Sequence, residues 1–211
     1  MRTAVIGLGN FGSTLATSLA RGGETVIVSR PHLAQARELA TRLGGSVEAL
    51  PIEQAIAKAD VVVLAIWFNV MTEFVTKNRS ALIGKIVVDP SNPIAPNGKG
   101  GFDKIIPADK SSGEIVAGLL PPGAELVKAF CSMGADSLSS GANRKPERAV
   151  LFYATDFPEA GRVASRLITA TGFDPMSAGG IDKSIRIEAF GDLNQFTLGK
   201  LVSVKEAEAL V

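Results

Sequence analysis

Short apolar runs alternate with helically spaced apolar positions along the first 90 residues of this chain. Runs rich in β-branched residues predict strands over residues 3–6, 25–28, 46–48, 61–66 and 85–89. Apolar residues spaced three or four apart predict helices over 11–21 and 32–43, each followed by a Gly-Gly pair. Strands and helices in this order are typical of a parallel sheet wound with crossover helices.

The pattern is less regular after residue 90. Residues 90–110 contain four prolines and three glycines without a sustained period, so we expect a loop that covers or binds something. We then expect a helix over 112–120, a strand over 125–130 and an irregular stretch over 131–148. A strand over 149–154, a helix over 157–171 and a strand after Gly172 follow, and residues 184–198 have a helical appearance.

Composition excludes several classes of protein. The net charge of +1 gives no basic field of the kind that nucleic-acid binding requires, so we expect no nucleic-acid partner. The longest apolar run has eight residues, far short of the roughly 20 that cross a bilayer, so we expect no membrane association. With one cysteine and one histidine, no internal disulfide and no zinc site built on such ligands is expected. A reducing, cytoplasmic location fits this composition.

A glycine-rich turn between the first predicted strand and the first predicted helix is the strongest chemical signal. Its sequence is Gly7-Leu8-Gly9-Asn10-Phe11-Gly12, a G-x-G-x-x-G pattern. In this context the first glycine permits a tight turn, the second lets the backbone approach a pyrophosphate and the third allows the helix to pack on the sheet. The pattern therefore predicts a dinucleotide-binding site, although a glycine-rich turn without a ligand is the alternative.

Ser29 and Arg30 stand at the end of the second predicted strand. Sites for NAD place an acidic residue there to bind the ribose hydroxyls. A guanidinium and a hydroxyl instead suit a ribose phosphate, because both donate hydrogen bonds to its oxygens. The pair predicts NADP as cofactor; alternatively, Arg30 is a solvated residue and the site accepts either dinucleotide.

Ligands of open α/β sheets lie at the carboxyl ends of the strands. The loops expected there supply further candidate residues: Ala65, Ile66 and Trp67, then Asn92, and finally Cys131 and Met133. Trp67 is suited to wall a planar ring but is equally compatible with the core, and Asn92 suits a carboxamide or a turn. His32 lies far from Cys131 in the sequence, which argues against a Cys/His nucleophile.

Acid and base groups are scarce among these candidates. An enzyme that reduces a carbonyl group needs a side chain to manage the hydroxyl proton. Direct hydride transfer between two redox cofactors needs mainly close stacking and orientation. The scarcity therefore favours the second kind of chemistry.

The ordered set of these motifs resembles the coenzyme F420-dependent NADP oxidoreductase family. The resemblance rests on the glycine turn, Ser29-Arg30 and four further segments, which are residues 59–66, 84–93, 126–130 and 172–179. It implies a Rossmann domain that binds NADP and a deazaflavin stacked on the nicotinamide at the sheet edge. Cys131 stands where members commonly have Asn, and the long loop over 94–110 is an elaboration.

The resulting fold prediction is a Rossmann-type, doubly wound, mainly parallel α/β sheet with a small C-terminal strand-helix-strand extension and a helical tail. Residues 1–148 would form the NADP-binding domain and residues 149–211 an extension packed on it, or both one continuous domain. The predicted cofactor-binding residues are Gly7, Leu8, Gly9, Asn10, Phe11, Gly12, Ser29, Arg30, Ala65, Ile66, Trp67, Asn92, Cys131 and Met133, with no catalytic side chain and no metal.

The favoured function is NADP-dependent hydride transfer to a small, planar redox acceptor such as coenzyme F420, a flavin or a quinone-like molecule. A second hypothesis is a reductase of a small imine or carbonyl compound, similar to pyrroline-5-carboxylate reductases, whose site is completed by the C-terminal tail of a partner in a homodimer. A third is an NADPH-binding sensor without catalysis.

Overall fold

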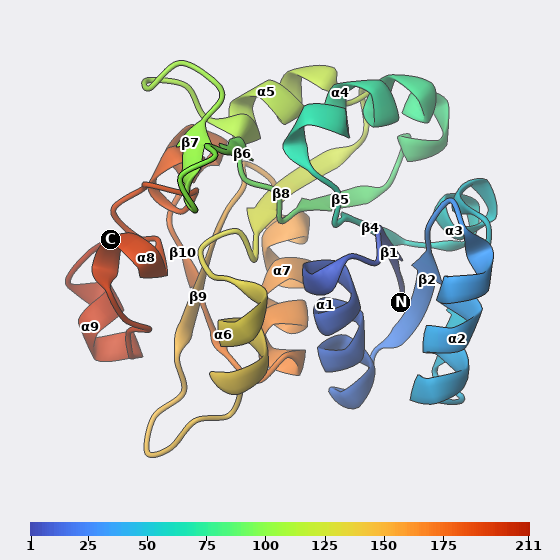
Figure 1. Ribbon diagram of the computed structural model, residues 1–211, viewed down its shortest axis with the longest axis horizontal. Helices are drawn as coiled ribbons and strands as arrows, with labels where there is room; N and C mark the ends of the chain where they lie inside the picture. Colours follow the sequence, from blue (N-terminus) through green and yellow to red (C-terminus); the bar gives the residue numbers. More distant parts are fainter.

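The computed structural model describes residues 1–211, whose backbone forms one eight-stranded sheet with helices on both faces (Figure 1). The sheet has the order β10-β9-β8-β5-β4-β1-β2-β3. Its strands are β1 (Arg2–Ile6), β2 (Thr25–Ser29), β3 (Val47–Ala49), β4 (Val61–Leu64), β5 (Ile86–Asp89), β8 (Glu125–Ala129), β9 (Val150–Ala154) and β10 (Asp174–Ser177). The α-helices are α1 (Asn10–Arg21), α2 (Leu33–Leu43), α3 (Ile52–Lys58), α4 (Phe68–Lys77), α5 (Ser112–Leu119), α6 (Ala135–Ser140), α7 (Pro158–Ala170), α8 (Gln195–Leu198) and α9 (Val204–Glu208).

The strand order reverses at β1, which lies between β2 and β4. The chain first builds outward from β1 to β3, then returns and builds from β4 toward the opposite edge. All neighbouring strands are parallel except β8 and β9, which are antiparallel. The predicted doubly wound, mainly parallel sheet is therefore confirmed, and its switch point places the β1 and β4 loops side by side.

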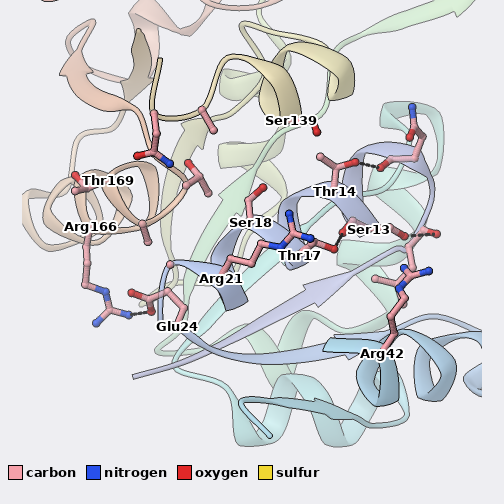
Figure 2. A pocket seen from close by; sticks show the side chains of 18 of the residues that line it. Ser13, Thr14, Thr17, Ser18, Arg21, Glu24, Arg42, Ser139, Arg166 and Thr169 are labelled. Carbon is pink, nitrogen blue, oxygen red and sulfur yellow. Dashed lines mark hydrogen bonds and ion pairs between the residues drawn. The ribbon is translucent and has the colours of Figure 1, made fainter. Parts of the chain in front are cut away.

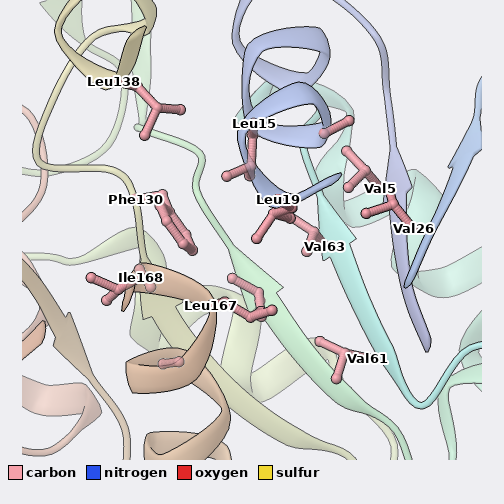
Figure 3. Packing of buried hydrophobic residues seen from close by; sticks show 14 of the residues in the cluster. Val5, Leu15, Leu19, Val26, Val61, Val63, Phe130, Leu138, Leu167 and Ile168 are labelled. Carbon is pink, nitrogen blue, oxygen red and sulfur yellow. The ribbon is translucent and has the colours of Figure 1, made fainter. Parts of the chain in front are cut away.

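Alternation along the central strands divides the core into two layers. Val5, Val61 and Val63 face α1, α2 and α7, where they pack with Leu15, Leu19 and Leu167 (Figure 3). Their neighbours along the same strands point to the other face and pack with helices α3, α4 and α5. Both faces are apolar because both are covered, which explains why residues 61–64 form a continuous apolar run.

The C-terminal third continues the same sheet. β9 pairs with β8, β10 pairs with β9, and α7 contributes Leu167 and Ile168 to the core that α1 shares. The predicted domain boundary at residue 148 thus falls inside one continuous sheet. The chain after β10 packs on the outer face of β9 through Ile187, Leu193 and Val202.

Three segments differ from the sequence-based expectation. Residues 90–110 are not one loop but contain an antiparallel hairpin of β6 (Ile94–Pro96) and β7 (Phe102–Lys104), whose strands are too short for alternation to reveal them. Residues 184–198 are not one helix: they hold the end of a 3-10 helix, η2 (Ile181–Arg186), several turns and α8. Helices α3, α4, α6 and α9 and the short 3-10 helix η1 (Arg79–Leu82) were not predicted.

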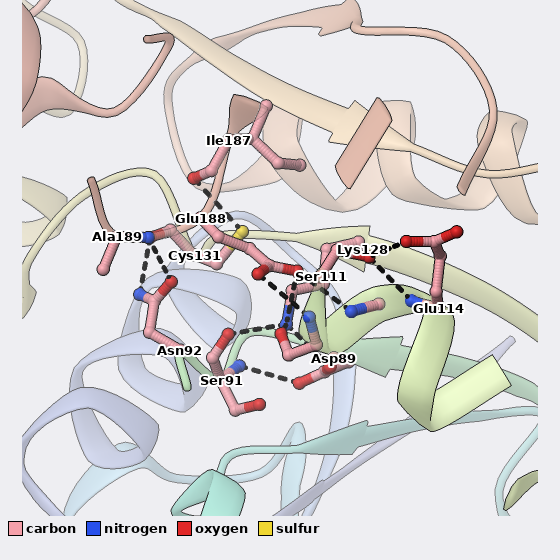
Figure 4. Close-up of polar contacts among 12 residues, drawn as sticks. Asp89, Ser91, Asn92, Ser111, Glu114, Lys128, Cys131, Ile187, Glu188 and Ala189 are labelled. Carbon is pink, nitrogen blue, oxygen red and sulfur yellow. Dashed lines mark hydrogen bonds and ion pairs between the residues drawn. The ribbon is translucent and has the colours of Figure 1, made fainter. Parts of the chain in front are cut away.

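A buried lysine joins the centre of the sheet to the C-terminal segment (Figure 4). The Lys128 ammonium donates to Asp89 Oδ2 at 2.7 Å, to the Ser91 carbonyl at 2.6 Å and to Ser112 Oγ at 2.7 Å. Glu188 lies 4.0 Å from the same Nζ and accepts the amides of Ser112 and Gly113 at the start of α5. Four segments therefore meet at one charge.

The charged state of Lys128 is stable inside this network. Burial lowers the pKa of Lys128, but the carboxylates of Asp89 and Glu188 raise it by more, and the net shift is upward from 10.5. The lysine is therefore charged at neutral pH. A raised pKa also means that its stabilising contribution persists at every pH below the ordinary lysine value and is lost only in strong alkali.

We expect Lys128→Met to lower the free energy of unfolding by about 3–5 kcal/mol, because it leaves buried carboxylates without their cation. Urea unfolding followed by circular dichroism measures this change. The matched control is Lys58→Met, which breaks the exposed pair with Glu48 and should cost less than about 1 kcal/mol. Equal losses in the two variants would contradict the role given to the buried network.

Candidate functional site

Two glycines of the turn between β1 and α1 are required by the fold itself. Gly7 has a φ of 96°, and a Cβ there would lie 2.3 Å from the Ala65 carbonyl oxygen at the end of β4. A Cβ on Gly12 would lie 2.0 Å from the Gly7 carbonyl oxygen. These contacts bring β1, α1 and the β4 loop together at the switch point, so neither glycine by itself points to a ligand.

Gly9 is different, because a Cβ at this position would meet no atom of the chain within 4 Å. Gly9 is also the N-cap of α1, a 12-residue helix with no side-chain cap and no acidic residue in its first turn. Its first amides are therefore free, and the positive end of the helix dipole faces open space. An anionic group such as a pyrophosphate fits this cradle.

Ser29 and Arg30 have unequal positions at the end of β2. The Ser29 side chain is fully buried and donates to the Leu50 carbonyl at 2.7 Å, so it supports the strand edge and does not reach solvent. The geometry therefore does not fit the predicted role of this hydroxyl at a ribose phosphate. Arg30 is partly exposed, and its buried Nε has no hydrogen-bond partner in the protein.

A cleft of about 820 Å³ lies at the carboxyl edge of the sheet. It brings together Gly9, Asn10, Phe11 and Gly12 of the turn with the predicted residues of the strand ends, which are Ala65, Ile66, Trp67, Asn92, Cys131 and Met133. Gly7, Leu8, Ser29 and Arg30 do not line this cleft. Leu8 lines the groove beside α1 that is described below.

Sequence reasoning missed one wall of the cleft. Residues of the hairpin and of the segment after η2 complete it, namely Ile94, Phe102, Ala189, Phe190, Asn194, Phe196 and Thr197. The chain's own C-terminal segment thus occupies the place that a partner's tail was expected to fill under the second hypothesis. In the sequence, only the aromatic residues of this segment indicated a binding role. No periodic pattern indicated that they lie at the sheet edge.

Asn92 holds that wall in place. Its Nδ2 donates to the Cys131 carbonyl at 2.8 Å, and its Oδ1 accepts the Ala189 amide at 2.7 Å (Figure 4). The amide group therefore bridges three segments and is not free in the way that recognition of a carboxamide would require. Ala189 precedes Phe190, a non-glycine residue with a φ of 71°, which Asn92 helps to fix.

The cleft lining contains no Asp, Glu, Lys, Arg or His side chain. Its single titratable group is Cys131, a thiol that is buried and lies 3.5 Å from the Ile187 carbonyl. Burial raises the pKa of Cys131 to about 12, so the thiol stays protonated at neutral pH. Protonated, buried thiols are poor nucleophiles, in agreement with the interpretation from the sequence.

A larger groove of about 1430 Å³ lies on the other side of α1, between α1 and the helices α6 and α7 (Figure 2). Many of its lining side chains are hydroxyls that donate to carbonyls of their own helices, as Thr14 does to Asn10 and Thr17 to Ser13. These groups are already paired, and the groove shares only residues 8–10 with the turn. The cleft at the sheet edge is therefore the better candidate site.

Two further findings concern the whole chain. None of its helices combines the length and the apolar character needed to span a membrane. No cluster of three or more His, Cys, Asp or Glu side chains is arranged to hold a metal ion.

Comparison with known proteins identifies a family and several structures that this chain resembles. The family described as NADP oxidoreductase coenzyme F420-dependent matches residues 2–93, which contain the glycine turn, Arg30 and Asn92. A hypothetical protein from Sinorhizobium meliloti is 33% identical, with a TM-score of 0.80 over 90% of this chain and 91% of that one. A protein from Arthrobacter sp. FB24, provisionally assigned as an F420-dependent NADP reductase, shares the fold at 20% identity, with a TM-score of 0.76 over 94% of this chain and 95% of that one.

Among curated proteins, the metalloreductase STEAP3 of Rattus norvegicus is 28% identical over 89% of this chain and 36% of its own length. The chain spans about a third of the length of the curated relatives that it matches. The matched region and the fold agree with the order of motifs from the glycine turn to the β5 loop. Residues 2–93 of the chain therefore belong to the family of NADP oxidoreductases described as coenzyme F420-dependent.

Proposed function

We propose that this chain transfers a hydride between NADP(H) and a planar redox acceptor, and that both bind in the cleft at the sheet edge. The observation that carries the proposal is the composition of the cleft. It joins the N-terminus of α1, which suits a pyrophosphate, to a set of exposed aromatic side chains and contains no charged side chain. Coenzyme F420, a flavin and a quinone-like molecule are the acceptors that suit this description.

Arg30 is the basis for proposing NADP as the dinucleotide. It follows β2, where sites for NAD carry an acid, and no protein group accepts a hydrogen bond from its Nε. The guanidinium as a whole is partly exposed, and its terminal nitrogens suit a phosphate, to which they can donate charge-assisted hydrogen bonds. Because Ser29 is buried, we assign the 2′-phosphate to Arg30 alone among the two predicted residues.

In this reaction NADPH gives a hydride to the acceptor and becomes NADP⁺, while the acceptor also takes one proton from solvent and becomes its dihydro form. The protein holds the two reactants in position and supplies no acidic or basic side chain. The free amides of α1 hold the pyrophosphate end, and Ile66 and Trp67 bound the part of the cleft next to the turn. Apolar walls exclude water from the stacked rings, so proximity and orientation supply the catalysis.

A reductase of imines or carbonyl compounds is less well supported, because no lining side chain is able to protonate such a substrate. The absence of acid and base groups is also compatible with a non-catalytic NADPH sensor. Mixing the protein with NADPH and a panel of flavin, deazaflavin and quinone acceptors separates these functions. Oxidation of NADPH supports the proposal, whereas tight binding with no oxidation by any acceptor would identify a sensor.

Gly9→Ala is expected to weaken NADPH binding at least tenfold, because the added methyl occupies the space into which the pyrophosphate fits. Stability should fall by about 0.5–1 kcal/mol, because alanine is a poorer N-cap than glycine although the new Cβ touches nothing in the protein. Isothermal titration and thermal unfolding measure the two effects. Gly45→Ala, another position with open space around it, serves as the control and should leave affinity unchanged.

Arg30→Ala should reduce the affinity for NADPH by at least tenfold and the affinity for NADH by less than about twofold, because only NADPH has the 2′-phosphate that the guanidinium would bind. Titration of both dinucleotides into each variant gives the ratio. Arg162→Ala removes an exposed arginine on α7 and should change neither value. An equal loss for both dinucleotides would remove the basis for assigning NADP.

We expect the turnover number to be nearly independent of pH between about pH 7 and about pH 9 with an acceptor that does not itself titrate in this range. The reason is that Cys131, with a pKa raised to about 12, is the only titratable group in the cleft. Steady-state rates at saturating NADPH measure the profile. A bell-shaped profile would instead indicate an acid or base that this geometry lacks.

A further inference from the structure

Four exposed aromatic side chains surround the cleft, and they come from three segments of the chain. Trp67 precedes α4 and Phe102 lies in β7, while Phe190 and Phe196 belong to the C-terminal segment. Their exposed fractions are 58%, 46%, 59% and 74% respectively. Large aromatic side chains gathered around one concave site indicate a surface that a flat, apolar ligand covers.

We propose that the part of the acceptor held in this cleft is a flat, uncharged ring system, with no phosphate, carboxylate or sulfonate group attached close to the ring. This inference rests on the proposed function and narrows its acceptor class. An anionic group buried beside these aromatic walls would lose its hydration without gaining a cationic partner, because no lysine, arginine or histidine lines the cleft.

Two cations that lie near the cleft in sequence are already committed. Lys128 lies next to the β8 loop, but it is fully buried and its three donors are used by Asp89, Ser91 and Ser112. Lys104 follows Phe102 in the sequence, but its ammonium donates to the carbonyls of Ala108 and Lys110. Neither is free to neutralise an anionic acceptor.

The phosphates of the dinucleotide give a second reason to expect an uncharged acceptor. Its phosphates would lie at the N-terminus of α1, which forms one end of the same cleft. A second anion in a cleft of about 820 Å³ would be repelled by these phosphates, and low-dielectric walls strengthen that repulsion. An uncharged ring avoids both costs and gains contact with the aromatic walls.

Among these aromatic residues, Phe190 has the most constrained backbone. Its backbone has a φ of 71°, which is uncommon for a bulky residue, and the side chain remains exposed at the cleft. The hydrogen bond from the Ala189 amide to Asn92 holds the preceding residue in place. Strain that is maintained in this way and leaves an aromatic ring facing a cleft is typical of a ligand-binding position.

The test compares two flavins that share one ring. Lumiflavin carries a methyl group on N10, and its N10-carboxymethyl analogue adds a carboxylate close to the same ring. Flavin fluorescence in the presence of NADP⁺, which cannot reduce either compound, gives both dissociation constants without turnover. We expect lumiflavin to bind at least about tenfold more tightly, because only its analogue loses the hydration of an unpaired charge. NADPH oxidation should show the same preference in kcat/KM.

Adding a positive charge at the cleft tests whether the missing cationic partner causes the preference for lumiflavin. Phe196→Lys places a cation at the rim, where the native side chain is 74% exposed and folding should be little affected. The preference for lumiflavin should then fall at least threefold. Ile83→Lys introduces the same charge at an exposed position outside the cleft and should leave the preference unchanged.

The outcomes separate this inference from the proposed function. Equal or tighter binding of the carboxymethyl flavin would overturn the uncharged acceptor while leaving NADPH oxidation intact. Selective binding of lumiflavin without any NADPH oxidation would support the uncharged site and overturn the oxidoreductase function. Binding of neither flavin to a protein that binds NADP⁺ would overturn the inference.

Discussion

The buried ammonium of Lys128 is the interaction on which the shape of the candidate site depends. It joins the end of β5, the loop after β5, the start of α5 and, through Glu188, the C-terminal segment. Such a charge in the interior is tolerated only when each of its donors has an acceptor, so the positions of all four segments are determined together. One consequence is that the loops bearing Asn92 and Phe190 have little freedom relative to the sheet.

The same network accounts for the neutrality of the cleft. The carboxylates of Asp89 and Glu188 lie behind the β5 loop, where Lys128 and the amides of α5 bind them. No charge from this group lines the cleft, whose side chains are aromatic, aliphatic, sulfur-containing or uncharged and polar. The helix end beside Gly9 and the guanidinium of Arg30 are thus the groups suited to an anion, whereas the part of the cleft proposed for the acceptor carries no charged side chain.

The sequence was sufficient for the parts of the fold that depend on local pattern. Buried strands such as residues 61–64 are apolar because both faces are covered, and the turn from Gly7 to Gly12 combines backbone conformation with close packing. The strand ends then placed Ile66, Asn92 and Cys131 together by topology. The position of Ser29 was not predictable in the same way, because β2 is buried on both faces and the Ser29 hydroxyl donates to the carbonyl of Leu50, 21 residues further along the chain.

The C-terminal wall could not be predicted because no local rule governs it. Residues 184–198 contain the end of a 3-10 helix, several turns and one short helix, and their arrangement depends on long-range contacts of Glu188 with α5 and of Ala189 with Asn92. Tertiary hydrogen bonds of this kind outweigh the helical tendency of the segment. Phe190 and Phe196, on which the proposed class of acceptor depends, lie in this part of the chain. Under the proposed function, acceptor specificity depends on long-range contacts, whereas dinucleotide binding depends on a local turn.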